Sequence, residues 1–211
     1  MHILNFEAFL VAITLLTITP GIDTVLVIKN TSRSGGRDGV VTSLGICLGL
    51  FVHATFSAIG ISAILLQSSE LFLAMKLVGA TYLIWLGIGG LKAAFKSHSG
   101  LMIDDSVARM SSVRRPLKEG FLSNVLNPKT AVFYLAFLPQ FIDPQYSPLL
   151  QAMTMAGIHF VIAMFWQCCL AGAVSSAKRF FASPVALKWM EGITGSVLIF
   201  LGSKLLFDEQ S

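Results

Sequence analysis

The sequence predicts an all-α integral membrane protein with six transmembrane helices. Charged residues make up 12% of the 211 residues and hydrophobic residues 55%, whereas typical soluble domains contain about 25% charged residues. Neither the stretch 39–69 nor the stretch 144–177 contains Asp, Glu, Lys or Arg. Each is longer than the roughly 20 residues that a helix needs to cross a bilayer.

Short polar connections separate the six expected spans. The spans are Phe6–Ile28, Gly39–Leu66, Leu71–Phe95, Phe121–Ile142, Pro148–Val174 and Val185–Phe207. No basic residue precedes the first span, so we interpret it as a mature helix and not as a signal peptide. The chain is therefore one transmembrane domain over residues 1–211, with a first half 1–95, a polar loop 96–119 and a second half 120–211.

The basic residues predict the orientation in the membrane. Twelve of the 15 Lys and Arg residues fall on one side, in or beside the connections after spans 1, 3 and 5: Lys29, Arg33, Arg37, Lys92, Lys96, Arg109, Arg114, Arg115, Lys118, Lys178, Arg179 and Lys188. By the positive-inside rule this side is cytoplasmic and both termini lie outside. Because the basic residues are dispersed over three loops, the sequence pI near 9.1 reflects topology and not a nucleic-acid partner.

Two spans contain a helix breaker next to an ionisable residue. Pro20 precedes Asp23 in the first span, and Pro128 precedes Lys129 in the fourth. A charge facing lipid near mid-bilayer costs roughly 2.5–3.5 kcal/mol, so such groups normally face a protein interior or a water-filled path. Paired broken helices of this kind are typical of a transporter binding site.

Each proline also leaves a backbone carbonyl without its helical donor. Pro20 deprives the carbonyl of Leu16, and Pro128 that of Asn124. Such carbonyls are costly in a membrane unless water, a side chain or a ligand meets them. We therefore expect both breaks to attract polar partners.

The two halves of the sequence are weakly alike. Lys76–Phe95 aligns with Lys188–Phe207 without a gap, Pro20 corresponds to Pro128, and His53 corresponds roughly to His159. Three helices per half give the second copy the opposite orientation. The sequence thus predicts a 3+3 inverted repeat with broken helices 1 and 4.

Several motifs in order resemble the LysE/RhtB family of amino-acid exporters. The motifs are Thr19-Pro20-Gly21-x-Asp23, Ser34-Gly35-Gly36-Arg37-x-Gly39, Leu44-Gly45-x3-Gly49-x3-His53, Gly120-Phe121-Leu122-x-Asn124-x2-Asn127-Pro128-Lys129 and Phe137-Leu138-Pro139-Gln140-Phe141. The resemblance implies amino-acid efflux across the cytoplasmic (inner) membrane of a bacterium, driven by the proton motive force. Position 22 is Ile where many relatives carry Pro, so the first break is expected to be less sharp here.

The residues around the breaks form the candidate binding site. These residues are Thr19, Pro20, Gly21, Asp23, Asn124, Asn127, Pro128 and Lys129. An α-amino acid is a zwitterion, and Asp23 with Lys129 can supply an anion for its ammonium and a cation for its carboxylate. The alternatives are that these two residues form a salt bridge with each other, that Lys129 extends to the membrane edge, or that Asn127 binds a freed carbonyl and not substrate.

Three further polar residues lie in spans. Asp23 and His53 are candidates for proton coupling, although a buried neutral His53 bonded to a neighbouring helix is the alternative; His159 is the weaker candidate of the two histidines. Gln140 either lines an exit path or caps a bent helix. Gly45 and Gly49 are expected to form a close helix-packing face.

Other chemistry has little support in the sequence. Cys47, Cys168 and Cys169 show no CxxC and no metal-ligand spacing, so neither a disulfide nor a metal site is expected. Signatures of hydrolases and phosphate-binding loops are absent, which favours a protein that is not an enzyme and needs no cofactor.

The sequence thus predicts a secondary transporter that exports a small amino acid or derivative by proton antiport. A homoserine- or threonine-like or other neutral amino acid is favoured, while basic and thiol-bearing amino acids stay open. Its partners are the amino acid, protons and the lipid bilayer, and a homo-oligomer is compatible with this interpretation. The alternative functions are a membrane thiol–disulfide electron carrier or a channel.

Overall fold

The computed structural model describes residues 3–65, 69–96, 112–177, 180 and 183–207. The regular structure of these residues is helical, apart from an isolated bridge between Ile3 and Ile142. The predicted loop 96–119 lies outside the described residues over 97–111, as do Lys178 and Arg179. The all-α prediction is confirmed for the described part of the chain.

Four long helices are apolar enough to cross a membrane: α3 (Gly36–Leu65), α4 (Ser69–Ala94), α7 (Pro148–Ser176) and α9 (Pro184–Phe207). A bent pair, α1 (Phe6–Ile18) and α2 (Ile22–Ser34), forms a fifth span if it is counted as one, with a bend of 47°. The first predicted span was too short at its end, because α2 continues past Ile28 through Lys29 and Arg33 to Ser34.

The segment predicted as span 4 consists of several short pieces. They are α5 (Arg114–Val125), α6 (Pro128–Val132), the π-helical η1 (Phe133–Phe137) and the 3-10 turn η2 (Leu138–Phe141). The predicted start at Phe121 was wrong by seven residues, since α5 already begins at Arg114. The break at Pro128 is confirmed, whereas the count of six spans stays a prediction.

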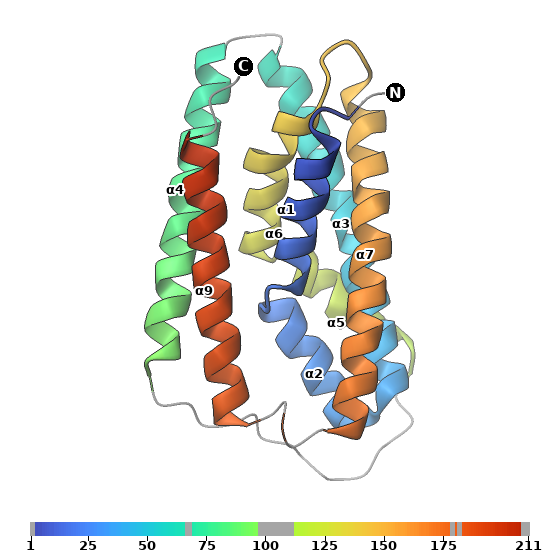
Figure 1. The fold of residues 1–211 in the computed structure, drawn as a ribbon. Helices are drawn as coiled ribbons and strands as arrows, with labels where there is room; N and C mark the ends of the chain where they lie inside the picture. The colour runs from blue at the N-terminus through green and yellow to red at the C-terminus, as the bar shows by residue number, and fades with distance from the viewer. Residues whose placement is uncertain (1–2, 66–68, 97–111, 178–179, 181–182, 208–211) are drawn as a thin grey trace.

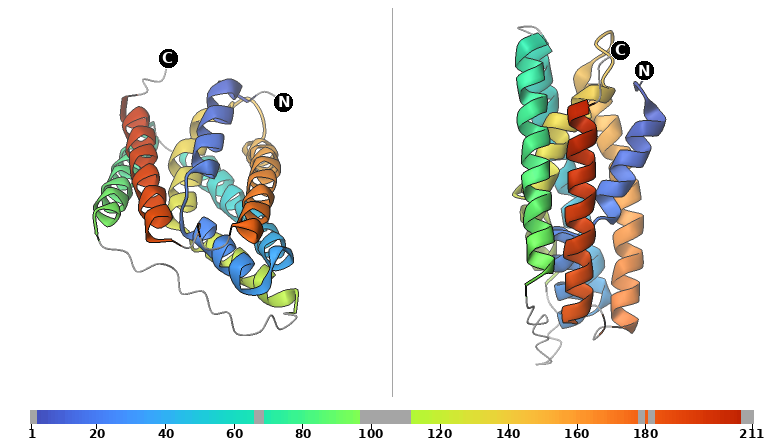
Figure 2. Two further views of the ribbon diagram at one scale, coloured as in Figure 1. Left: turned by 60° about the horizontal axis from the view of Figure 1, so that its bottom comes forward. Right: turned by 60° about the vertical axis from the view of Figure 1, so that its left-hand side comes forward.

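Two antiparallel helix pairs enclose the broken helices (Figure 1). α4 lies along α9 on one side, α3 lies along α7 on the other, and α1 and α6 lie between the pairs; the turned views agree (Figure 2). Tyr134 and Phe9 are fully buried among the broken helices. This arrangement places both breaks inside the protein, where their polar groups do not face lipid.

Glycines allow the closest helix contacts. A Cβ atom on Gly45 would lie 2.1 Å from the carbonyl oxygen of Leu117, and one on Gly120 would lie 2.1 Å from that of Thr42. The backbones of α3 and α5 therefore touch at this crossing. The predicted packing role of Gly45 is confirmed.

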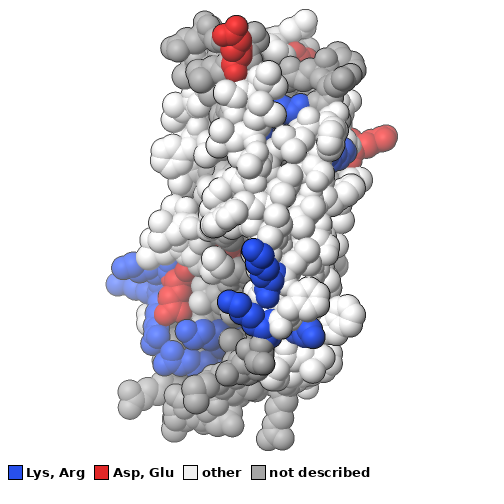
Figure 3. Space-filling model, turned by 90° about the vertical axis from the view of Figure 1, so that its left-hand side faces the viewer, with Lys and Arg blue, Asp and Glu red and all other residues white. Residues whose placement is uncertain are grey.

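The start of α1 and the end of α9 lie at one end of the bundle (Figure 1). The C-terminal ends of α2, α4 and α7 lie at the other end. Most of the Lys and Arg side chains visible on the α4 face gather at that second end (Figure 3). On this face the basic side chains are therefore concentrated at one end of the molecule, as the positions of Lys and Arg in the sequence predicted.

Candidate functional site

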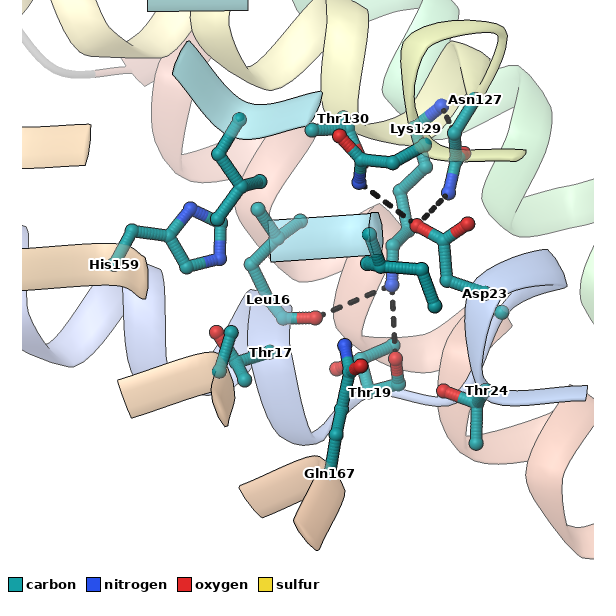
Figure 4. Close-up of a pocket in the computed structure, with 15 residues that line it drawn as sticks. Leu16, Thr17, Thr19, Asp23, Thr24, Asn127, Lys129, Thr130, His159 and Gln167 are labelled. Atoms are coloured by element: carbon teal, nitrogen blue, oxygen red, sulfur yellow. Dashed lines mark hydrogen bonds between the residues drawn. The ribbon is translucent and has the colours of Figure 1, made fainter. Parts of the chain in front are cut away.

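The two breaks face each other at the centre of the bundle (Figure 4). Asp23 lies in the first turn of α2, directly after the first break. Lys129 lies in the first turn of α6, directly after the second. Both point from their helix into the space between the breaks.

Asp23 is bound by three neutral side chains from the second break. Ser123 Oγ donates to Oδ1 at 2.6 Å, while Asn124 Nδ2 and Asn127 Nδ2 both donate to Oδ2 at 2.9 Å. Asp23 is 9% exposed. Hydrogen bonds to an ionised acceptor are stronger than those between neutral groups, and here they compensate the burial of the carboxylate.

Lys129 binds the carboxyl end of the opposite broken helix. Its Nζ donates to the carbonyl oxygens of Leu16 at 3.2 Å and Thr19 at 2.8 Å. The Leu16 carbonyl is the one that Pro20 deprives of a donor, and a cation is favourable at a helix C-terminus. A Cβ on Gly21 would lie 3.3 Å from this Nζ, so Gly21 provides room for the lysine, while its φ of −163° is one that any residue adopts.

Asp23 and Lys129 do not bind each other. Within the described residues, the partners of the carboxylate are the three side chains above, and those of the ammonium are the two carbonyls. The alternative of a direct salt bridge was therefore wrong. Because Lys129 reaches inward to α1, the alternative that it extends to the membrane edge was wrong as well.

The second break receives its donors from α3 and from its own backbone. The carbonyl of Asn124, which Pro128 deprives of its donor, accepts from His53 Nε2 and from the Asn127 N–H, both at 2.9 Å. Since a carbonyl only accepts, Nε2 of His53 carries the hydrogen. Of the two roles predicted for His53, this hydrogen bond to α5 is the contact expected for a histidine bonded to a neighbouring helix.

Asn127 has a role that the sequence did not indicate. Its Oδ1 accepts from the backbone N–H of Lys129 at 3.0 Å, which caps α6, while its Nδ2 donates to Asp23. We expected a bond to a freed carbonyl or to substrate. Asn127 is the N-cap residue of α6. This explains why it directly precedes Pro128, which occupies the first helical position.

A cavity of about 40 Å³ lies between the breaks. It has room for about three water molecules. Six of the predicted site residues line it: Thr19, Gly21, Asp23, Asn124, Asn127 and Lys129. Pro20, Pro128 and His53 are not among the lining residues, since the prolines shape the breaks and His53 lies behind Asn124.

Several polar residues of the site were missed in the sequence. Thr17, Thr24, Thr130 and Gln167 also line the cavity, and Ser123 binds Asp23. His159, the weaker of the two predicted histidines, lines the cavity too. Nδ1 of His159 shares a hydrogen bond with the hydroxyl of Tyr134, at 3.0 Å. The spacing of His159 and Gln167, two turns apart in an apolar span, was a signal that these residues share one face.

Gln140 lies away from the cavity. Its Nε2 donates to the carbonyl of Ala136 at 3.2 Å, four residues earlier. It is not among the residues that line the cavity. Its contact matches the capping role, and the exit-path role stays a prediction.

A comparison with known protein families identifies the family of this chain. The family model described as LysE type translocator matches residues 14–209. The chain belongs to the LysE type translocator family. As a LysE type translocator it is a membrane transporter and not an enzyme.

Three curated relatives illustrate the range of this family. The uncharacterized membrane protein YrhP of Bacillus subtilis is 33% identical over 97% of this chain and 98% of its own. A homoserine/homoserine lactone efflux protein of Salmonella typhimurium is 30% identical over 94% of both chains. A leucine efflux protein of Klebsiella pneumoniae is 29% identical over 77% of both. No solved structure matches the chain.

Metal and thiol chemistry have no support in the described residues. Among these, no group of three His, Cys, Asp or Glu side chains could hold a metal ion. Cys47, Cys168 and Cys169 are free thiols on α3 and α7. Neither break contains a cysteine, as a thiol–disulfide carrier built on these breaks would require.

Proposed function

We propose that this translocator exports a small neutral amino acid, of the homoserine or threonine type, from the bacterial cytoplasm in exchange for protons. The observation that carries the proposal is a buried carboxylate, Asp23, and a half-buried lysine, Lys129, that face one space without pairing to each other. A zwitterion matches both groups at once. The names of the relatives, which include homoserine and leucine efflux, support the choice of a neutral amino acid.

Substrate would replace neutral partners at each charge. Its carboxylate would take Lys129 from the carbonyls of Leu16 and Thr19, and its ammonium group would bind Asp23. Each exchange trades a contact with a neutral group for one between opposite charges, which is favourable in a poorly hydrated site. The cavity holds only about three water molecules, so binding requires the breaks to separate.

Proton coupling would act through Asp23. The ionised carboxylate accepts three hydrogen bonds. A bound proton turns one acceptor oxygen into a donor and competes with the ammonium group of the substrate. One carboxylate therefore suffices to couple the two fluxes, and His53 is the second candidate because it binds the same Asn124.

The same proposal includes a six-span inverted repeat with both termini outside the cytoplasm. Pairing of α3 with α7 and of α4 with α9 supports it, because an inverted repeat brings equivalent helices together. The basic connections at the end away from the termini support the orientation.

The test is uptake of a labelled amino-acid panel into inverted vesicles with an imposed pH gradient. We expect the native protein to accumulate neutral amino acids and Asp23→Asn to lose pH-driven uptake at least 100-fold. Glu7→Gln is the matched control, since Glu7 is an exposed carboxylate on α1. Retained pH-driven uptake in Asp23→Asn would exclude Asp23 as the obligatory coupling residue and leave His53.

A further inference from the structure

We propose that Gln167 reads the side chain of the substrate and selects one that carries a hydroxyl group. This inference rests on the proposed function and concerns the same cavity. Gln167 lies on α7, is 9% exposed and lines the cavity, and its Oε1 has no hydrogen-bond partner among the described residues. A buried polar atom without a partner is costly and requires an explanation.

The position of Gln167 on α7 suits a side-chain reader. His159, Ala163 and Gln167 are spaced four residues apart and all line the cavity, so one face of α7 forms this wall. Ala163 leaves space between the two larger side chains. Figure 4 shows Gln167 extending from α7 toward Thr19, while Asp23 and Asn127 lie on the other side of the Lys129 ammonium group.

The neighbouring polar groups are already committed. Thr17 and Thr19 donate their hydroxyls to carbonyls of their own helix, those of Ile13 and Leu15. His159 is bonded to Tyr134. The hydrogens of both threonine hydroxyls are therefore used, whereas Gln167 Oε1 is a buried oxygen of the α7 wall that makes no hydrogen bond in the part of the chain that the structure describes.

Asn124 has the other unpartnered buried oxygen of the cavity lining, but it is turned toward α3. A Cβ on Gly49 would lie only 2.7 Å from Asn124 Oδ1. Its Nδ2 is bound to Asp23. Asn124 therefore belongs to the part of the site that holds the charge, and Gln167 is left for the rest of the substrate.

A primary amide both accepts and donates hydrogen bonds. A hydroxyl group can satisfy both functions, whereas a methyl or isobutyl group satisfies neither and leaves the amide buried and unpaired. Sites that bind a substrate hydroxyl reject analogues without it far more strongly than apolar pockets reject an added methylene. If the substrate had a cationic side chain, that side chain would find no carboxylate on this wall to pair with, since Asp23 is the carboxylate among the described lining residues. The substrate class is therefore a small amino acid with a side-chain hydroxyl.

Homoserine and norvaline are the decisive probes, because norvaline has a methyl group in place of the hydroxyl. The ratio of kcat/KM for the two is measured with the native protein, Gln167→Leu and Gln167→Met in the vesicle assay. We expect the native protein to prefer homoserine at least tenfold and both variants to bring the ratio within about twofold of unity. Phe165→Leu, an exposed position on α7, should keep the native ratio.

Three results would overturn the inference. In the first, the native protein transports norvaline as well as homoserine. In the second, it transports other amino acids but neither probe. In the third, a Gln167 variant transports both probes with an unchanged kcat/KM ratio. The first and third results would leave the proposed export of a small neutral amino acid in place, whereas the second would leave amino-acid export in place but not the homoserine or threonine type. Absence of any amino-acid transport by the native protein would instead remove the proposed function, and the inference with it. If neither variant folds, the native ratio alone decides.

Discussion

The break before Gly21 and the break before Pro128 each leave a carbonyl oxygen without its helical donor, and the two oxygens receive different partners. The Leu16 carbonyl meets the Lys129 cation, which comes from the other half of the chain. The Asn124 carbonyl meets two neutral donors, His53 and the Asn127 N–H. At the first break the hydroxyl of Thr194 on α9 also donates to the carbonyl of Pro20, so this break is held by one cation and one neighbouring helix. The second break is held by its own backbone and by α3. The two breaks therefore differ in the charge of the donor that meets the freed carbonyl.

Removing the cation tests the first break and has the largest expected effect. Lys129→Met leaves two carbonyls without their donor, and hydrogen bonds to charged groups are worth about 1.5–3 kcal/mol each. We expect the free energy of unfolding to fall by about 3 kcal/mol or more and transport to be lost. Thermal unfolding in detergent and the vesicle assay measure both, with the exposed Lys92→Met as control. Native transport by Lys129→Met would contradict the assigned role.

Removing the histidine tests the second break, and a smaller effect is expected. His53→Leu leaves the Asn124 carbonyl with the Asn127 N–H, so we expect a loss of about 1–2 kcal/mol and transport reduced about tenfold. His53→Gln can still donate a hydrogen bond and should retain more of both. If His53→Gln keeps pH-driven uptake, His53 does not carry the coupled proton. Equal losses in the two variants would show that the hydrogen bond is not what matters.

Crowding Asn124 sharpens the comparison with the smallest expected effect. A Cβ on Gly49 would lie 2.7 Å from Asn124 Oδ1 and 2.9 Å from its Cβ, so Gly49→Ala must shift Asn124, which donates a hydrogen bond to Asp23. Overpacking costs about 1–3 kcal/mol, partly offset by about 1 kcal/mol of helix propensity. We expect near-native stability with transport reduced severalfold. Gly60→Ala is the matched control on α3, since nothing lies within 4 Å of its Cβ position; equal transport by both variants would contradict the role of Asn124.

The breaks and their charges were predictable because both are local features. Proline removes a specific donor, and a charge in an apolar run must face the interior. The partners of Asp23 were not predictable, since Asn124 lies 101 residues further along the chain and a sequence does not give distances across helices. The start of α5 was missed for a different reason: charged residues suggested a loop, but a helix can continue into water with its backbone bonds intact.

The site beyond the breaks was only partly predictable. Thr17 and Gln167 lie in helices that are predominantly apolar. Their sequences therefore do not indicate which face points inward. The cavity wall on α7 depends on how that helix is rotated against α1, which is a property of tertiary packing. Gln140 was given two alternative roles because it follows Pro139 near the outer end of a span, and the structure bonds it to the carbonyl of its own turn.

The wide separation of Asp23 from its partners also bears on biosynthesis. A ribosome adds about 5–20 residues per second, so the 101 residues between Asp23 and Asn124 take about 5–20 s to be made. During this interval the carboxylate has none of its three donors. The nascent first span must therefore keep Asp23 hydrated or protonated, at the membrane surface or within the insertion machinery, until the second half arrives. The first helix pair therefore reaches its final hydrogen bonding only after the second break has been synthesised.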